Sequence, residues 1–354
     1  MLPPDPPAPA TRDDGFDFAP VSRCDPLAIE QFAATVWPAA ADRTDVLAKW
    51  WMTTGADAAT AAIDRSTGAI AGLCVGVPSD WLIGGRLVAA ASICNWFVSP
   101  AYMGRGLGKA LVRSFGDRAP FLNAFSVSPA AIDNFRKLGW IGPFRSQLLL
   151  FPLPALRGWR RPRPTAIKLH AYRAERNIVP TGLAEALDRI DREKPPGVVR
   201  RRRAADDLRR HLSYLPSRAF DIHVVSIDDA PIGYFALRPA DHHAGRRYRQ
   251  ARLHYVSDLV LNRADHQTVR QVLGAIAAAP SVRRAGAILL CTTDQAIVAA
   301  AASSGWLTDR SPLIGPALGR KAPLYMKGDG FKQGDPDGLD LQLTFFDSDV
   351  DLNI

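Results

Sequence analysis

Two spacings of apolar residues alternate along the chain, and they predict different elements. Apolar positions three or four residues apart are typical of amphipathic helices, and short apolar runs bounded by turn residues are typical of strands. In the first half, the helical spacing covers residues 25–37, 44–54, 107–118 and 128–140. The strand-like runs are 59–64, 69–78, 80–100, 121–127 and 145–154. This order predicts a mixed sheet with helices on its faces.

Turn residues sharpen these boundaries. The sequence "RSTG" between the first two strand-like runs predicts a hairpin, and Gly84–Gly85 predicts a second hairpin within 80–100. Ser128 and Pro129 are a typical helix start, and Gly139 is a typical helix stop.

The second half repeats the same order of elements. Its helix-like and strand-like segments are 180–194, 198–216, 220–239, 251–261, 265–279, 285–293 and 294–306. Gly305–Trp306 also repeats Gly139–Trp140. We therefore predict an internal duplication, that is, a tandem α/β fold built from two mixed-sheet α+β units. The expected organisation is a flexible Pro-rich arm (1–20), a first domain (21–156), a basic linker (157–179), a second domain (180–330) and an acidic tail (331–354).

Composition agrees with two globular domains. The chain has 354 residues, of which 47% are hydrophobic and 22% charged. No apolar run is long enough to span a bilayer, and the first twenty residues lack the pattern of a signal peptide, so we expect a cytoplasmic protein. The four cysteines are scattered, which predicts neither a metal site nor disulfides.

The net charge of +9 favours anionic ligands, although an arginine-rich composition alone also explains it. A nucleic-acid partner is not expected, because no helix-turn-helix or zinc-finger pattern is present and aromatic residues are not interleaved with the basic runs.

The stretch "WFVSPAYMGRGLGKALVRSF", from Trp96 to Phe115, has the clearest candidate chemistry. It is not a P-loop, because Met103 stands where the first glycine is needed and Ala110 follows Lys109. It is not a dinucleotide fingerprint either. What remains is a strand, a glycine turn and a helix N-terminus, which together let an anion such as a pyrophosphate approach backbone amides. The alternative is a glycine turn without a ligand.

The spacing of several motifs resembles that of the GNAT acetyltransferase superfamily. The matching residues are Val98, Pro100, Tyr102, Gly106, Gly108, Ala131, Gly139 and Trp140. The resemblance covers residues 20–155 and implies acetyl-CoA, or another acyl-CoA, as co-substrate. The implied cofactor-binding residues are Trp96, Phe97, Val98, Met103, Gly104, Arg105, Gly106, Leu107, Gly108, Lys109, Ser128 and Phe135. In this comparison the loop amides hold the pyrophosphate, the strand backbone pairs with the pantetheine arm, and Arg105 and Lys109 contact phosphates or simply face solvent.

Three residues depart from the family pattern. Met103 replaces a Gln or Arg, at a position that acts mainly through its backbone N–H. Ser128 replaces a frequent Asn and can still donate a hydrogen bond. Phe135 stands where many members have the Tyr that protonates the leaving thiolate, so either the thiolate leaves unaided or another residue supplies the proton.

The family chemistry is direct attack of an amine on the thioester, which implies an acyl-CoA-dependent N-acyltransferase. Asn95, Asp80 and Glu30 are candidate catalytic residues, whereas Cys94 is expected to be a small buried residue. A non-catalytic acyl-CoA-binding pseudoenzyme or scaffold is the alternative, which Phe135 favours.

The second copy has "NRADHQ" (262–267) in place of the glycine loop, so we expect it to have lost acyl-CoA binding. Asp258 and the run Arg200–Arg203 are candidate contacts for an acidic acceptor, with a strand-end acid and a solvated charge run as the alternatives. The ending "FFDSDVDLNI" loosely resembles two-copy GNAT-like proteins of bacterial polysaccharide clusters, which implies a small-molecule or amino-sugar acceptor.

Overall fold

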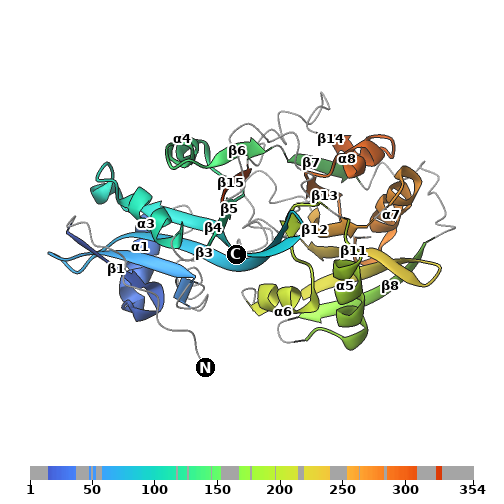
Figure 1. The fold of residues 1–354 in the computed structure, drawn as a ribbon, viewed down its shortest axis with the longest axis horizontal. Coiled ribbons are helices and arrows are strands. Elements are labelled where there is room, and N and C mark those ends of the chain that lie inside the picture. Colours follow the sequence, from blue (N-terminus) through green and yellow to red (C-terminus); the bar gives the residue numbers. More distant parts are fainter. Residues whose placement is uncertain are drawn as a thin grey trace. The chain divides into compact units, whose positions relative to one another are not determined.

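The fold was analysed in a computed structural model of the chain (Figure 1). It describes residues 15–36, 48, 51–52, 58–116, 119–125, 127–144, 146–152, 167–175, 178–195, 197–213, 219–239, 253–262, 264–282, 285–308 and 324–328. The chain divides into two compact units: Met1–Pro78 with Ile93–Leu122, and Ser79–Ser92 with Asn123–Ile354. The boundary cuts through β3 (Ile70–Ile83) and β4 (Arg86–Val98), so both strands contribute to both units.

The first unit is built on β1 (Phe16–Pro20), β2 (Ala59–Asp64) and the adjoining parts of β3 and β4. These strands follow one another in the order β1-β2-β3-β4, and the β1–β2 and β2–β3 pairs are antiparallel. The two hairpin turns predicted from "RSTG" and Gly84–Gly85 are both present, and the glycines have positive φ angles of 57° and 77°.

Helices cover both faces of this part of the sheet. On one face, α1 (Pro26–Val36) packs through Phe32 against Trp51, and Trp51 also packs against Phe97 of β4. On the other face, α3 (Leu107–Gly116) approaches β3 so closely that a Cβ atom at Gly76 would lie 2.9 Å from the Phe115 ring. Glycine at this position is therefore a packing requirement.

Strand β5 (Phe121–Ala124) also crosses the boundary, between Leu122 and Asn123, and α4 (Pro129–Lys137) and β6 (Ile141–Phe144) follow in the second unit. The last described strand of the chain, β15 (Leu324–Gly328), lies between β5 and β6 (Figure 1). The short strand β9 (Arg200–Arg201) pairs with the end of β3.

The second sheet lies wholly in the second unit and has the order β14-β7-β13-β12-β11-β10-β8. Its strands are β7 (Gln147–Pro152), β8 (Lys168–Glu175), β10 (Ala219–Ile227), β11 (Ala230–Pro239), β12 (Leu253–Leu261), β13 (Ala287–Thr292) and β14 (Leu307–Thr308). The β12–β13 pair is parallel and its neighbours are antiparallel, so the sheet is mixed.

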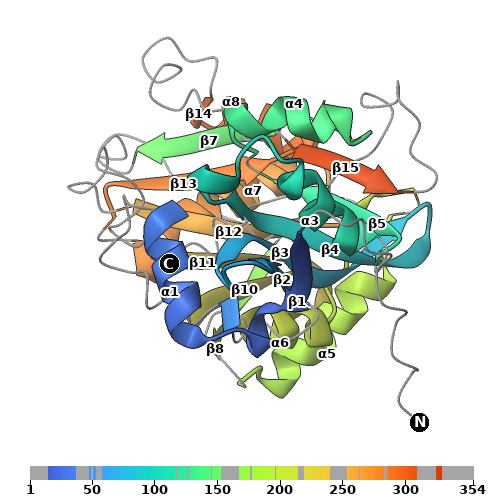
Figure 2. The same ribbon diagram turned by 90° about the vertical axis from the view of Figure 1, so that its left-hand side faces the viewer.

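Four helices accompany the second sheet: α5 (Thr181–Arg192), α6 (Ala205–Ser213), α7 (His266–Ala278) and α8 (Gln295–Ala302). Figures 1 and 2 show α7 and α8 beside each other, and their apolar side chains join those of β7, β12 and β13 in one core. Helices α5 and α6 also contact each other, and α5 packs on β11. None of the helices in the described ranges is long and apolar enough to cross a membrane.

The predicted fold class, a tandem mixed α/β fold, is confirmed, and the order of elements is repeated in the two halves. Several elements were not predicted. Strand β1 lies within the segment expected to be a flexible arm, and β8 lies within the expected linker. The run 145–154 was expected to complete the first sheet, but its strand β7 pairs with β13 and β14, while β15 takes a place in the first sheet. The expected acidic tail lies outside the described residues, and the domain boundaries stay a prediction.

Candidate functional site

The candidate site begins where β4 ends. The Ser99 N–H donates to the Ala71 carbonyl at 2.9 Å, and a 3-10 turn (Pro100–Tyr102) follows at once. The Met103 N–H donates to the Pro100 carbonyl at 3.3 Å, so this amide is already used within the turn. The side chain of Met103 is 65% exposed.

Gly104 and Gly106 give the following loop its shape. Their φ angles are +82° and +79°, a conformation that a residue with a Cβ atom adopts only at a cost. A Cβ atom at either position would meet nothing within 4 Å, so the space above both is open. Side chains at these two positions would fill the open space above the loop, which we call the cradle.

The loop leads directly into the N-terminus of α3. The N–H groups of Lys109 and Ala110 donate to the Gly106 carbonyl at 3.0 and 3.3 Å, so the helix begins there. The amides just before them have no partner within the helix, and the helix dipole adds partial positive charge. The first turn of α3 contains no acidic residue. This end of α3 is therefore suited to an anion.

Gly108 has a different role in the same loop. A Cβ atom at Gly108 would lie 3.1 Å from Nε1 of Trp96 on β4. This glycine therefore allows α3 to pack against the strand, whereas Gly104 and Gly106 shape the open cradle.

Arg105 lies between these two open glycines. Its guanidinium carbon is 4.7 Å from the centre of the Phe16 ring and 5.7 Å from that of Tyr102. Lys109, in the first turn of α3, is half-buried. Both cations predicted to contact phosphates are thus carried by the loop or by the first turn of the helix.

Residues 26–140 match the sequence profile of the Acetyltransferase (GNAT) family. The match covers 115 of the 354 residues.

Solved structures agree on the fold. A GCN5-related N-acetyltransferase from Anabaena variabilis is similar with a TM-score of 0.60 and 14% identity, over 88% of this chain and 72% of that one. A probable N-acyltransferase from Enterococcus faecalis gives 0.56 and 10%, over 88% and 72%. A putative acetyltransferase from Pyrococcus horikoshii gives 0.52 and 11%, over 95% of both chains. At these identities the likeness shows the fold alone. No curated protein is detectably similar to the chain in sequence.

Among residues 26–140, the structure places the three candidate catalytic residues in different surroundings. Asn95 is buried, and its Oδ1 accepts a hydrogen bond of 2.7 Å from Nε1 of Trp51. Its Nδ2 donates to the Cys94 carbonyl at 2.8 Å, so both ends of the amide are used. Glu30 lies half-buried on α1 and makes no ion pair within the described residues.

Asp80 belongs to the second unit. Its Oδ2 lies 3.2 Å from Nη2 of Arg210 on α6, and its carbonyl accepts from the Arg202 N–H at 2.7 Å. These contacts tie β3 to the segment that begins α6.

The two remaining predicted cofactor residues are Ser128 and Phe135. Ser128 is exposed and precedes α4, but its side chain makes no capping hydrogen bond. Phe135 is buried, with its ring 4.7 Å from that of Trp140 and 5.7 Å from that of Tyr325 on β15. Cys94 is half-buried, and its Sγ donates to the Val75 carbonyl at 3.7 Å.

The arginine run of the second copy is not a solvated charge run. Arg200, Arg201 and Arg203 are all buried. Nε of Arg203 donates to Oδ2 of Asp258 at 2.7 Å, and the Tyr234 hydroxyl donates to the same oxygen at 2.6 Å. Asp258 is likewise fully buried, so it is neither a strand-end acid nor a contact for a bound acceptor. Sequence reasoning missed this pair because its partners are far apart in the chain.

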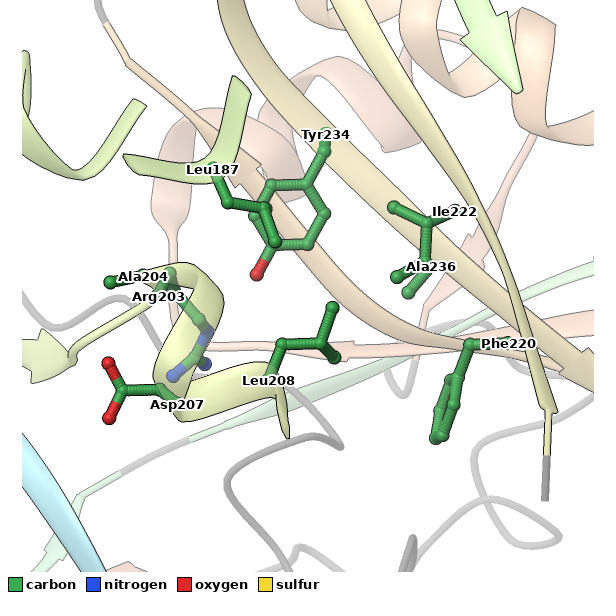
Figure 3. A pocket seen from close by; sticks show the side chains of 9 residues that line it. All are labelled: Leu187, Arg203, Ala204, Asp207, Leu208, Phe220, Ile222, Tyr234 and Ala236. Atoms are coloured by element: carbon green, nitrogen blue, oxygen red, sulfur yellow. The ribbon is translucent and has the colours of Figure 1, made fainter. Parts of the chain in front are cut away.

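Figure 3 shows Arg203 and Tyr234 among the side chains that line a small cavity between α5, α6 and the strands β10 and β11. The cavity wall is mostly apolar, and the carboxylate of Asp207 points away from it. Burial raises the pKa of Asp207 in spite of the nearby Arg202, Arg201 and Arg210 cations.

The second copy has no counterpart of the open helix terminus. At the start of α7, Oδ1 of Asp265 accepts a hydrogen bond of 2.6 Å from the Thr268 N–H, and the bonds to Thr268 lower the pKa of Asp265. The N-terminus of α7 therefore already holds a carboxylate, which repels a phosphate. Within the described part of the chain, no group of His, Cys, Asp and Glu side chains is arranged to hold a metal ion.

Proposed function

We propose that the protein is an acyl-CoA-dependent N-acyltransferase that transfers an acetyl or other acyl group to an amine. The observation that carries this proposal is the loop before α3: Gly104 and Gly106 have positive φ angles and open space above them, and no acid lies in the first turn. Together with the match of residues 26–140 to the GNAT family profile, this arrangement favours the pyrophosphate of an acyl-CoA as the anion.

In this proposal, different residues of the chain bind different parts of the acyl-CoA. The amides from Gly104 to Gly108 would hold the pyrophosphate, and the backbone of Trp96 to Val98 would pair with the pantetheine arm. When bound, acyl-CoA supplies a thioester as acyl donor. The protein would contribute orientation of the two reactants and a backbone N–H that polarises the thioester carbonyl.

The attacking amine must lose a proton to a base or to water. Asn95 cannot accept one, and Asp80 is paired with Arg210. Glu30 is therefore the first carboxylate to test as a base. For the acceptor we propose a small molecule, with an amino sugar as the first class to try, and we propose that the reaction takes place in the cytoplasm.

A second candidate function is a non-catalytic acyl-CoA-binding protein. One observation favours it: Phe135 has no group that can protonate a leaving thiolate, and its ring is packed against Trp140 and Tyr325. A thiol with a pKa of about 8.5 is a tolerable leaving group, so the absence of a donor at this position does not prevent catalysis.

The test is calorimetric titration with acetyl-CoA, comparing the wild type with Gly106→Glu. The new carboxylate would lie in the cradle beside the phosphates, and we expect affinity to fall at least about tenfold, which corresponds to about 1.4 kcal/mol. Gly68→Glu is the matched control, because Gly68 also has a positive φ (+71°) and open space but lies in the β2–β3 turn. Equal affinities of the two variants for acetyl-CoA would refute the assignment of the glycine loop as the pyrophosphate-binding site.

Release of free CoA thiol, measured with a panel of amines, then separates the two candidate functions. Turnover with any amine supports the enzyme, and binding without turnover across the panel supports the non-catalytic protein.

A further inference from the structure

The position of Arg105 is more closely determined than that of an ordinary exposed arginine. Its guanidinium lies over the face of Phe16, which comes from β1, and near the ring of Tyr102, which comes from the turn after β4. The two rings also contact each other edge to face, with centroids 5.8 Å apart. A residue at the start of the described chain thus helps to place a cation in the glycine loop.

The aromatic platform, Phe16 and Tyr102, is itself anchored. Phe16 is 3% exposed and is paired in register with Asp64 of β2. The Tyr102 N–H donates to the Ser99 carbonyl at 2.9 Å. The Tyr102 hydroxyl also lowers the pKa of the Asp64 carboxyl, although less than Ser66 does. Both rings are therefore held by contacts that do not involve Arg105.

Arg105 makes no ion pair within the described residues. The acid that follows Phe16 in β1, Asp17, is 2.7 Å from Nε of Arg65. The Asp64 carboxylate accepts from the backbone N–H and the hydroxyl of Ser66, at 2.8 and 2.6 Å. A guanidinium stacked on a ring keeps its N–H groups in its own plane, where they form a fork that matches a phosphate. Holding that plane in advance reduces the rotamer entropy lost on binding.

We propose that Arg105, held on the platform of Phe16 and Tyr102, recognises the 3′-phosphate of CoA and makes the site selective for CoA over 3′-dephospho-CoA. In the proposed function the loop amides hold the pyrophosphate, whose oxygens carry less charge. The 3′-phosphate is a terminal monoester with a charge of about −1.5 to −2, and it is the group that best fits a preorganised bidentate cation. Phe16 is then a positioning residue for cofactor selectivity.

This inference rests on the proposed function, since it needs an acyl-CoA at the loop. The test measures the affinities of CoA and 3′-dephospho-CoA by calorimetry for the wild type, Arg105→Gln, Phe16→Leu and the double variant. Arg113→Gln is the matched control, because Arg113 is exposed in the last turn of α3, the helix that follows the loop, and its loss changes the net charge equally.

We expect the wild type to prefer CoA by about tenfold or more, as one charge-assisted contact allows. Arg105→Gln should reduce this preference to about twofold with little change for 3′-dephospho-CoA, and Arg113→Gln should leave it unchanged. Phe16→Leu should reduce the preference about threefold, as a partly exposed cation–π contact allows. When Arg105→Gln is already present, adding Phe16→Leu should not change the preference for CoA any further. The single variant Phe16→Tyr should retain the preference for CoA over 3′-dephospho-CoA.

Two outcomes overturn the inference while leaving the proposed function intact. The first is an equal loss of affinity for both ligands in Arg105→Gln, which would assign the guanidinium to the pyrophosphate. The second is the same effect of Phe16→Leu with and without Arg105, which would reduce Phe16 to a structural role. If the folded wild type binds neither ligand, the proposed function and this inference both fail.

Discussion

Removing Asp258 should destabilise the second unit severely. The side chains of Arg203 and Asp258 are 2% and 1% exposed, and the carboxylate accepts from Arg203 at 2.7 and 3.4 Å and from the Tyr234 hydroxyl at 2.6 Å. Asp258→Ala leaves a buried guanidinium without its counter-charge. Breaking a buried ion pair in this way typically costs about 3–5 kcal/mol. The Tyr234 hydroxyl loses its acceptor as well, which adds about 1–3 kcal/mol if no water replaces it.

A double substitution should be much less destabilising than Asp258→Ala. Replacing both partners at once, as in Arg203→Met with Asp258→Leu, removes the charge as well as its partner. The desolvation cost of both ions then disappears. The Tyr234 hydroxyl still lacks its acceptor, so the double variant should be less stable than the wild type by no more than about 1–3 kcal/mol. The two single substitutions are therefore strongly non-additive.

Urea denaturation provides the measurement, followed by tryptophan fluorescence and by far-ultraviolet circular dichroism to detect separate unfolding of the two units. Buried Trp306 is in the second unit and reports on its core. A cost below about 1 kcal/mol for Asp258→Ala would refute the view that the pair is a buried, mutually dependent contact. A double variant as unstable as the single variant would refute the desolvation argument.

Two further predictions concern the surroundings of the same cavity. Burial raises the pKa of Asp207 in the folded state, so the contribution of Asp207 to stability is fully present below its ordinary pKa and is lost as pH rises through the folded-state pKa. The Asp207→Asn variant does not titrate at this position, so it should gain stability relative to the wild type as pH rises from acidic to neutral. A constant difference in urea midpoint between the two proteins across that range would contradict this. Ala236 lines the cavity in Figure 3, and Ala236→Val should stabilise the protein by roughly 1–1.5 kcal/mol at about 0.8 kcal/mol per added carbon; a lower thermal midpoint would show that the cavity cannot take the extra volume.

Comparison of the two copies explains why one carries the candidate site. Asn95 on β4 and Asp258 on β12 are both buried polar residues of a central strand, and each binds a side chain that comes from elsewhere, Trp51 and Arg203 respectively. The helices that follow the two strands differ at their N-termini. Glycines leave the start of α3 open, whereas Asp265 caps α7. The two copies thus differ at the N-terminus of this helix, while the order of elements around it is the same.

Local features of this protein were determined by the sequence itself. The glycine loop, the hairpin turns and most helices depend on interactions between residues close together in the chain, such as the bond from Lys109 to Gly106. Apolar spacing and turn residues report such interactions directly. The mixed α/β class and the duplicated order of elements follow from the same local signals, and both are confirmed.

Only the tertiary structure decided which distant segments pair. The apolar run of β7 can pair with any sheet that offers a free edge. The spacing of its residues does not specify that β7 pairs with β13 and not with β6. Whether an arginine is solvated or buried depends equally on its partner, and Arg203 finds Asp258 at a separation of 55 residues. The same holds for Arg105, whose place on Phe16 depends on β1 pairing with β2. Strand pairing and charge burial are contacts between remote residues, and no local pattern specifies them.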